Sequence, residues 1–453
     1  MPVSTKAKEY SEKLPQWVQV DDCINDRVKQ KGVAYLPKPN PDDKSAENVS
    51  RYNQYLIRAI FMNVVKRTHD GFVGFVYRLP PTIELPTQTE YLEDSATQDG
   101  LDLTQFSKEV LSNTMNAGRG AILVDYPPSE GGTAAETDGL QAYMIAYKSE
   151  DVINWKVKNG KLVLVVIQGC YEVPIDEFES EIKEQYLVLK IDENGYYVQE
   201  TWRDDALYDS VEPRQSSGQR WPFIPFTFVG TVNNDNRIDP SLLFSISDIN
   251  IGHYRNSADL EENCFIHSQL TLGITSDLDN EQFLKANPQG VQVGSRAGHF
   301  LGSSGGFHSV QATENALAAR LQNDKQEQMS AIGAQILEQG GPSETAEAVK
   351  TKSGANTATL SNLAHNVSAA ITLACEWAGL FMGTTEDVTF RLNQDFFPNT
   401  VSPREMAALI QLYDRGRLAG VDVYNRLKEA GYIAEGRTFE DIEGEASEQD
   451  PLV

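Results

Sequence analysis

Long apolar runs and closely spaced cysteines are missing from this chain of 453 residues. The longest apolar run, Leu162 to Ile167, has the length of a strand and falls far short of the ~18 residues that a membrane span requires. The 4 cysteines show no Cys-x-x-Cys spacing, which favours buried thiols in a reducing compartment over a disulfide framework or a zinc site. These absences argue against a secreted, membrane-spanning or disulfide-stapled protein.

Positive charge is scarce as well. Lys and Arg together number 39 against 65 Asp and Glu, so the formal net charge is −26. Because a DNA-binding protein neutralises phosphates with cationic side chains, this balance argues against ordinary DNA binding. The length is roughly three times the ~150-residue expectation for one domain, so two or three domains are expected.

Signatures of catalysis are absent too. No Gly-x-x-x-x-Gly-Lys-[Ser/Thr] loop occurs, which argues against an ATPase, and the 6 histidines have no paired metal-ligand spacing. Asp125, at the end of a predicted strand, and the adjacent Asp204 and Asp205 are the best candidates for a Mg²⁺ site. A strand-end cap and a turn explain these aspartates more simply. We therefore predict no catalytic residue, metal or cofactor and no enzyme activity, with a metal-dependent nuclease or hydrolase as the alternative.

Hydrophobic periodicity organises the first half of the chain. Residues 1–44 mix charge and proline and predict an N-terminal arm, and Ser45 begins a helical pattern that Asp70-Gly71 is expected to break. Another helix is predicted over 103–116, ending at glycine, and a buried strand over 121–126.

The region after a loop-like segment, 128–138, is predicted to be rich in β-structure. Asn159-Gly160 and Asn194-Gly195 each separate two strand-like runs, and Asn-Gly is a strong hairpin signal because both turn residues must take positive φ. Two successive hairpins predict a small antiparallel sheet.

Long helices dominate the second half. Asp239-Pro240 predicts the start of a helix that reaches about His267, and its half over 250–263 is polar nearly all round. Such a helix usually bridges domains or packs against a neighbouring copy. A second long helix is predicted over 314–337, followed by a segment rich in Gly, Ser, Thr and Glu.

The clearest periodicity lies further on. Apolar residues from Leu360 to Phe381 alternate steps of three and four, so a helix with a buried seam that includes Trp377 is expected. Two more helices should follow Ser402-Pro403, and the acid-rich end of the chain predicts a disordered tail.

This order of elements is similar to the core of tailed-phage portal proteins. A half-polar helix, a small β-containing excursion, a returning helix, a flexible loop and an amphipathic helix follow one another. Four segments, at 55–60, 67–74, 118–127 and 251–262, resemble a portal-like phage subfamily often filed as a domain of unknown function. The resemblance spans about residues 45 to 435.

The resemblance implies an α+β portal fold. That fold has a wing of helices and antiparallel β-hairpins, a two-helix stem, a small β-containing clip and a C-terminal helical crown. The implied divisions are an N-terminal arm (1–44), wing (45–238), first stem helix (239–268), clip (269–313), second stem helix (314–338), tunnel loop (339–356), wing helix and strand (357–401), crown (402–435) and acidic tail (436–453).

The resemblance also implies a function. Portal subunits form a homo-oligomeric ring of about twelve copies at one capsid vertex, and double-stranded DNA passes through the ring during packaging and ejection. The implied partners are the terminase large subunit, a head–tail adaptor, and the major capsid and scaffolding proteins, with no membrane. The implied location is the virion, with the host cytoplasm during assembly. Another virion structural protein, such as a head–tail adaptor, is a further alternative.

Two groups of site residues follow from the resemblance. An acidic channel wall would repel DNA phosphates and let the duplex slide, with Lys350 and Lys352 touching phosphates or simply lying in a solvated loop. The tunnel-loop residues are Gly340, Gly341, Ser343, Glu344, Glu347, Lys350, Lys352 and Gly354. The clip residues expected to dock terminase are Gln282, Lys285, His299, Gly302, Gly305 and His308.

Overall fold

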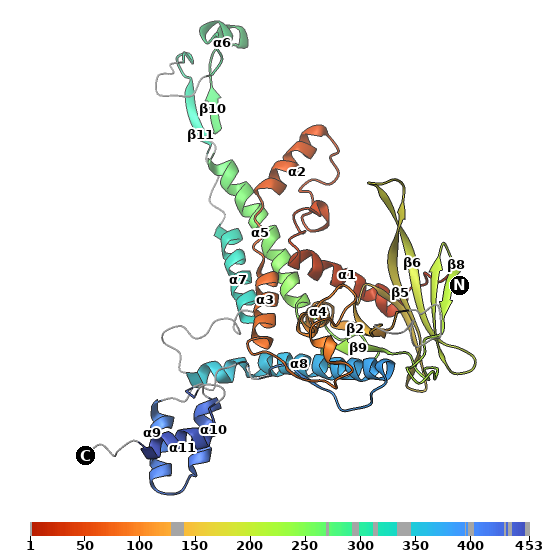
Figure 1. Ribbon diagram of the computed structural model, residues 1–453. Helices are drawn as coiled ribbons and strands as arrows, with labels where there is room; N and C mark the ends of the chain where they lie inside the picture. Colours follow the sequence, from red (N-terminus) through yellow and green to blue (C-terminus); the bar gives the residue numbers. More distant parts are fainter. Residues whose placement is uncertain are drawn as a thin grey trace.

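The protein is an α+β chain with an extended outline in a computed structural model (Figure 1). A helical body carries a five-stranded sheet on one side, two antiparallel helices leave the body towards a small β-unit, and three helices near the C-terminus lie at the opposite end. The structure describes all residues except 1, 128–139, 269–270, 292–298, 311–315, 333–345, 395, 397–402, 430–431, 434–436 and 449–453. The loop predicted over 128–138 therefore lies outside the described residues.

The N-terminal segment belongs to the core. Helix α1 (Lys8–Ile24) buries Trp17, Val20 and Cys23, and the Trp17 indole donates a hydrogen bond to the carbonyl oxygen of Ala117 at 2.8 Å. The structure thus differs from the expected arm. The apolar side chains of α1 are spaced to face the body, although the charges and prolines around them hid that pattern.

Two helices follow where one interrupted pattern was expected. Helix α2 (Ala46–Arg58) begins at Ser45, whose hydroxyl accepts from the Asn48 N–H, and α3 spans Val64–Val76. The predicted break at Asp70-Gly71 is wrong, because both residues lie inside α3. The chain leaves helical geometry at 59–63 instead, between the two helices.

A three-stranded antiparallel sheet forms the centre of the body. Helix α4 (Leu103–Ala117) ends at Gly118, which has φ +82°, and a Cβ at Gly118 would collide with the carbonyl oxygen of Asp239. Strand β2 (Arg119–Asp125) lies between β3 (Tyr143–Lys148) and β9 (Phe226–Gly230). The predicted helix over 103–116 and strand over 121–126 are confirmed.

The second sheet is a five-stranded antiparallel meander. The first hairpin turn has φ 53° at Asn159 and 75° at Gly160, whereas in the second turn only Gly195 has positive φ, and the Asp192 side chain accepts from the Tyr196 N–H. Both predicted hairpins are confirmed. The strands are β4 (Val152–Lys158), β5 (Lys161–Pro174), β6 (Ser180–Ile191), β7 (Tyr197–Arg203) and β8 (Ala206–Val211).

The two antiparallel helices are α5 (Phe244–Ser268) and α7 (Ala316–Ile332). The predicted helix start at Asp239 is wrong, because the Asp239 carboxylate accepts from the N–H groups of Val232 and Asn233. Ser241 caps α5 instead, through its hydroxyl oxygen. Between the helices lies a small unit, which we call the tip: β10 (Thr271–Thr275), α6 (Asn280–Ala286) and β11 (Gly306–Val310), with β10 and β11 antiparallel.

Helix α8 (Ala346–Met382) crosses the base of the body and is the longest of the described helices. Its seam from Leu360 to Phe381 is buried as predicted, except that Trp377 is only half-buried and Ala378 takes the core position. Strand β12 (Thr389–Arg391) then pairs with β1 (Thr82–Glu84).

Three helices form the C-terminal unit: α9 (Pro403–Asp414), α10 (Gly420–Glu429) and α11 (Phe439–Glu448). The prediction of a disordered acidic tail is wrong for α11. The Phe439 ring packs edge-on against Tyr424 with centroids 5.7 Å apart, and the Asp441 carboxylate accepts from the Thr438 N–H. In the described part of the chain, no helix is both long and apolar enough to cross a membrane.

Candidate assembly surfaces

The polar half of α5 forms hydrogen bonds with the backbone of a non-helical connection. Residues 59–63 pass across α5 with their peptide groups facing it. The fully buried Asn250 accepts from the Val64 N–H at 3.1 Å and donates to the Met62 carbonyl oxygen at 2.9 Å, and the Ser257 hydroxyl accepts from the Ile60 N–H at 3.1 Å. These polar side chains of α5 therefore have hydrogen-bond partners inside a single subunit.

Further along α5 the same pattern continues with charged groups. Tyr55 donates to the Asp259 carboxylate at 2.6 Å, and Arg58 forms an ion pair with Glu262 while its guanidinium lies 4.0 Å from the centre of the Phe265 ring. The expectation that a neighbouring copy supplies the burial for this half of α5 is therefore wrong. Sequence periodicity counts apolar side chains only, so it missed partners that come from α2.

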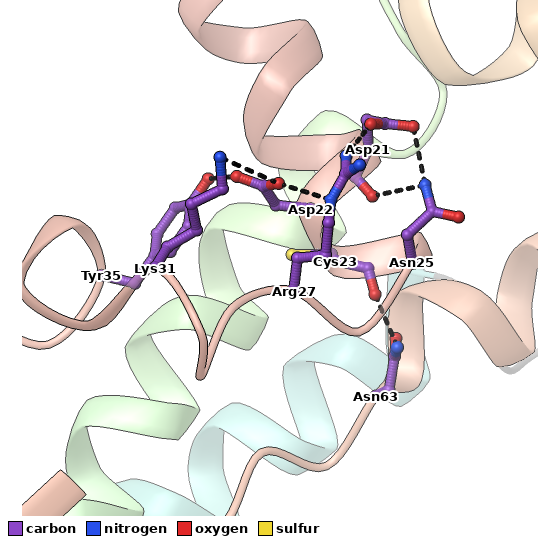
Figure 2. Close-up of polar contacts among 8 residues, drawn as sticks. All are labelled: Asp21, Asp22, Cys23, Asn25, Arg27, Lys31, Tyr35 and Asn63. Atoms are coloured by element: carbon purple, nitrogen blue, oxygen red, sulfur yellow. Dashed lines mark hydrogen bonds and ion pairs between the residues drawn. The ribbon is translucent and has the colours of Figure 1, made fainter. Parts of the chain in front are cut away.

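A polar network fixes the end of α1 beside this connection, as Figure 2 shows. The buried Asp22 carboxylate accepts from the Tyr35 hydroxyl at 2.8 Å and from Arg27 Nε at 2.9 Å, while Asp21 forms an ion pair with Arg27. Asn63 donates to the Cys23 carbonyl oxygen. Burial raises the pKa of the Cys23 thiol to about 12, so this cysteine is a protonated core residue at neutral pH.

One face of α7 packs on α5. Lys325 Nζ donates to the Gly252 carbonyl oxygen at 3.0 Å and Met329 is buried. His253, only 4% exposed, faces this interface, and burial, together with the charge of Lys325, lowers the pKa of His253. On α7, Leu317 and Leu321 remain exposed, at 63% and 42%. Leu317 and Leu321 precede Lys325 and Met329 at steps of four on the same stripe of α7, so this stripe leaves apolar surface uncovered at its start.

The six predicted clip residues lie in the tip or in the loop that precedes β11. Gln282 and Lys285 are on α6, with Lys285 Nζ 3.9 Å from Glu281. His308 on β11 approaches the Thr275 hydroxyl at 3.3 Å, whereas the His299 ring lies against Phe307. Gly302, with φ +91°, and Gly305 shape the loop between them, where the Asp277 carboxylate accepts from the N–H groups of Ser303 and Ser304. The tip also exposes Leu284 and Phe300, at 60% and 62%.

The predicted tunnel loop divides into two parts. Gly340, Gly341, Ser343 and Glu344 lie outside the described residues. Glu347, Lys350, Lys352 and Gly354 lie in the first turns of α8, so the loop prediction is wrong for 346–356. Alanines and lysines are good helix formers, and they outweigh the single glycine at 354.

The three aspartates of the alternative nuclease interpretation lie in different settings. Asp125, at the end of β2, accepts from the Tyr143 hydroxyl at 3.4 Å and from the Gln199 amide at 3.3 Å, and burial raises its pKa. Asp204 and Asp205 form the exposed β7–β8 turn with φ 51° and 58°, which confirms the turn interpretation. Within the described ranges, no group of three or more His, Cys, Asp or Glu residues is placed to hold a metal ion.

Comparison with known proteins gives two results. A family described as "Domain of unknown function (DUF4055)" matches residues 243–382, which run from the start of α5 to the end of α8. No curated protein matches the chain significantly.

Among solved structures, the chain is similar to a chain in the virion of a native gene transfer agent particle. Identity is 11%, the TM-score is 0.43, and the alignment covers 90% of this chain and 96% of that chain. It is also similar to chains from the neck of the empty particle computed with C6 symmetry (12% identity, TM-score 0.42, 85% and 93% covered) and the neck of the native particle computed with C12 symmetry (12%, 0.40, 90% and 96%).

Proposed function

We propose that this chain is the subunit of a phage portal, a ring of about twelve identical copies at one capsid vertex through which double-stranded DNA is packaged and ejected. The observation that carries this proposal is the α5–tip–α7–α8 arrangement. Two antiparallel helices lead away from the body and carry a small β-unit at their far end, and a long helix crosses the base (Figure 1). This is the element order that the sequence resemblance to portal proteins implies.

Uncovered apolar surface on this part of the chain supports a ring. Large exposed apolar side chains occur along α5, the tip and α7, where a solitary subunit would leave them in water. In a closed ring each subunit presents two different faces to its neighbours, which would cover such residues. These side chains are Phe265, Ile266, Leu284, Val291, Phe300, Phe307, Leu317, Leu321 and Ile332.

The acidity of the chain supports a conduit. Duplex DNA carries about one negative charge per 1.7 Å of its axis, so a wall rich in carboxylates repels the phosphates and leaves the duplex free to slide. With a net charge of −26, twelve subunits would provide such a wall without any sequence reading. Glu344 and Glu347 would contribute carboxylates, and Lys350 and Lys352 would make occasional phosphate contacts.

The partners follow from this role. The tip would dock the terminase large subunit during packaging and a head–tail adaptor afterwards, using Gln282, Lys285, His299 and His308, while the body would contact capsid and scaffolding proteins. A separate motor would supply the energy, in keeping with the missing phosphate-binding loop. The subunit would therefore have no enzymatic activity, and its location would be the capsid vertex of the virion.

Negative-stain microscopy and light scattering of the purified chain test this proposal. A portal subunit gives rings with a central hole and shows no Mg²⁺-dependent DNA cleavage. A monomer that cleaves DNA with Mg²⁺ would contradict the proposal and favour the nuclease. A head–tail adaptor also forms rings, so a second assay is needed. Co-expression with capsid and scaffolding proteins should incorporate the ring at a vertex of DNA-free shells, whereas a ring that stays separate from such shells would favour an adaptor.

A further inference from the structure

The two hairpins that flank β5 are opposite in charge, and the β6–β7 turn beside the first of them contains Asp192 and Glu193. At the β4–β5 end, Lys156, Lys158 and Lys161 are exposed, and the stretch from Val152 to Tyr171 contains no Asp or Glu. Within the described parts of the chain, none of these three lysines forms an ion pair or a side-chain hydrogen bond. Val157, 40% exposed, lies among them. We call this end the basic end.

The opposite end of β5 is acidic. It contains one base, Lys183, which pairs with Glu181 at 3.4 Å. The apolar side chains here are unusually exposed: Phe178 at 94%, Ile182 at 69% and Ile175 at 61%. We call this end the acidic hairpin, and its acids are Glu172, Asp176, Glu177, Glu179, Glu181 and Glu184.

The acidic hairpin is an ordered structure. Asp176 Oδ1 accepts from the N–H groups of Phe178 and Glu179, both at 2.8 Å, and the Ile175 N–H donates to the Glu179 carbonyl oxygen at 2.9 Å. Beyond residue 168, β5 pairs only with β6, because β4 begins at Val152, opposite Ile167. The hairpin therefore projects past the neighbouring strands and holds Phe178 in solvent, as Figure 1 shows for β5 and β6.

The two ends cannot neutralise each other within one subunit. A strand of 14 residues is about 46 Å long at ~3.3 Å per residue, several times the screening length of ~8 Å at physiological salt. The two ends of β5 thus present charges of opposite sign on two separate surfaces, and each surface also exposes apolar side chains. That is the requirement for a head-to-tail contact between identical chains.

We propose that the acidic hairpin of one copy docks on the basic end of the next copy in the ring. This inference rests on the proposed ring function and adds the contact that joins the sheets of neighbouring subunits. Phe178 would lie on Val157 and the aliphatic stems of Lys158 and Lys161, while the glutamates would face the ammonium groups. Twelve such contacts would close the outer rim of the ring.

Charge reversal with mixing tests the contact. One variant carries Glu177→Lys and Glu179→Lys, and the other carries Lys158→Glu and Lys161→Glu; Asp176 is kept because it builds the turn. Each variant alone sets like charges against each other at the substituted positions of the contact, so the subunit concentration for half-assembly should rise at least ~10-fold. In a 1:1 mixture every contact again joins opposite charges, and assembly should return to the wild-type concentration.

The matched control is Glu90→Lys with Glu93→Lys, which changes the net charge equally at two exposed positions on another element and should assemble like wild type. Phe178→Ser, which retains the backbone hydrogen bonds of the turn, should also weaken assembly, whereas Tyr208→Ser on β8 should not. Wild-type assembly by either charge variant, or no recovery on mixing, would overturn this contact and leave the ring proposal intact. A wild-type chain that never forms rings would instead overturn the proposed function.

Discussion

The body and the projecting part of this molecule satisfy their apolar and polar groups in different ways. In the body, Leu363 and Val367 of α8 and Ile122 of β2 are fully buried in one hydrophobic core. Along α7 and the tip, Leu317 and Phe300 remain largely exposed. The body thus buries its core within one chain, whereas α7 and the tip leave large apolar side chains in water.

The largest effect should separate these two regions directly. Leu363→Ala removes a fully buried side chain of the α8 seam and should lower the free energy of unfolding by about 2–5 kcal/mol. Leu317→Ala should change it by less than about 0.5 kcal/mol, since that side chain is already in water. Urea unfolding at a subunit concentration below assembly measures both. Equal losses would show that α7 belongs to the same folded core as α8.

A second prediction concerns the connection that lies across α5. Asn250→Ala removes a fully buried side chain together with its hydrogen bonds to the Val64 N–H and the Met62 carbonyl, and should cost about 2–4 kcal/mol. Asn256→Ala provides the control on the same helix, because Asn256 Nδ2 has no hydrogen-bond partner among the described residues. Its cost should stay below about 1 kcal/mol. If the Asn250 variant unfolds at the same urea concentration as wild type, the connection is not held from α5.

Replacing two glycines by alanine should change the free energy of unfolding in opposite directions. Gly118→Ala adds a Cβ that collides with the Asp239 carbonyl at φ +82° and should destabilise the body by about 1–3 kcal/mol. Gly74→Ala lies inside α3 with open space around it and should stabilise by about 0.5–1 kcal/mol. Thermal unfolding followed by circular dichroism measures both shifts. A stabilising effect at Gly118 would contradict the packing of α4 against the segment that precedes α5.

The smallest effect is a pH dependence at the α5–α7 interface. Burial lowers the folded-state pKa of His253, so the unfolded chain takes up a proton more readily. The free energy of unfolding should therefore fall as pH drops below the ordinary value of ~6.5, by up to roughly 1 kcal/mol near pH 5.5. His253→Gln should lose that component, so the difference between the two proteins isolates it from carboxylates that titrate in the same range. A constant difference from pH 7.5 to 5.5 would contradict the buried neutral imidazole.

Local signals in the sequence predicted much of the body correctly. The helix over 103–116 has its capping glycine, and the hairpins carry Asn-Gly turns, so neighbouring residues decide these structures. The half of α5 over 250–263 could not be interpreted in this way. Asn250 is explained by Val64, which is 186 residues away along the chain, and single-sequence periodicity contains no such information.

The candidate site was predicted less well than the fold. Gln282 and His308 lie in the small unit between α5 and α7, and the prediction that they form a docking clip stays a prediction. The predicted end of the tunnel loop is wrong, because alanines extend α8 back to residue 346. The prediction that Trp377 is buried is wrong as well, because the buried seam shifts to Ala378 in the last turns of the helix. The acidic hairpin around Phe178 was not predicted at all, although its run of glutamates with isolated apolar residues was the signal that could have revealed it.

In the proposed ring, neighbouring copies cover the apolar surface that one chain leaves exposed. Native mass spectrometry of the purified full-length chain at micromolar concentration tests it most directly. A single closed species of about twelve chain masses that dissociates to monomers without unfolding is expected. A stable monomer across the accessible concentration range would contradict it.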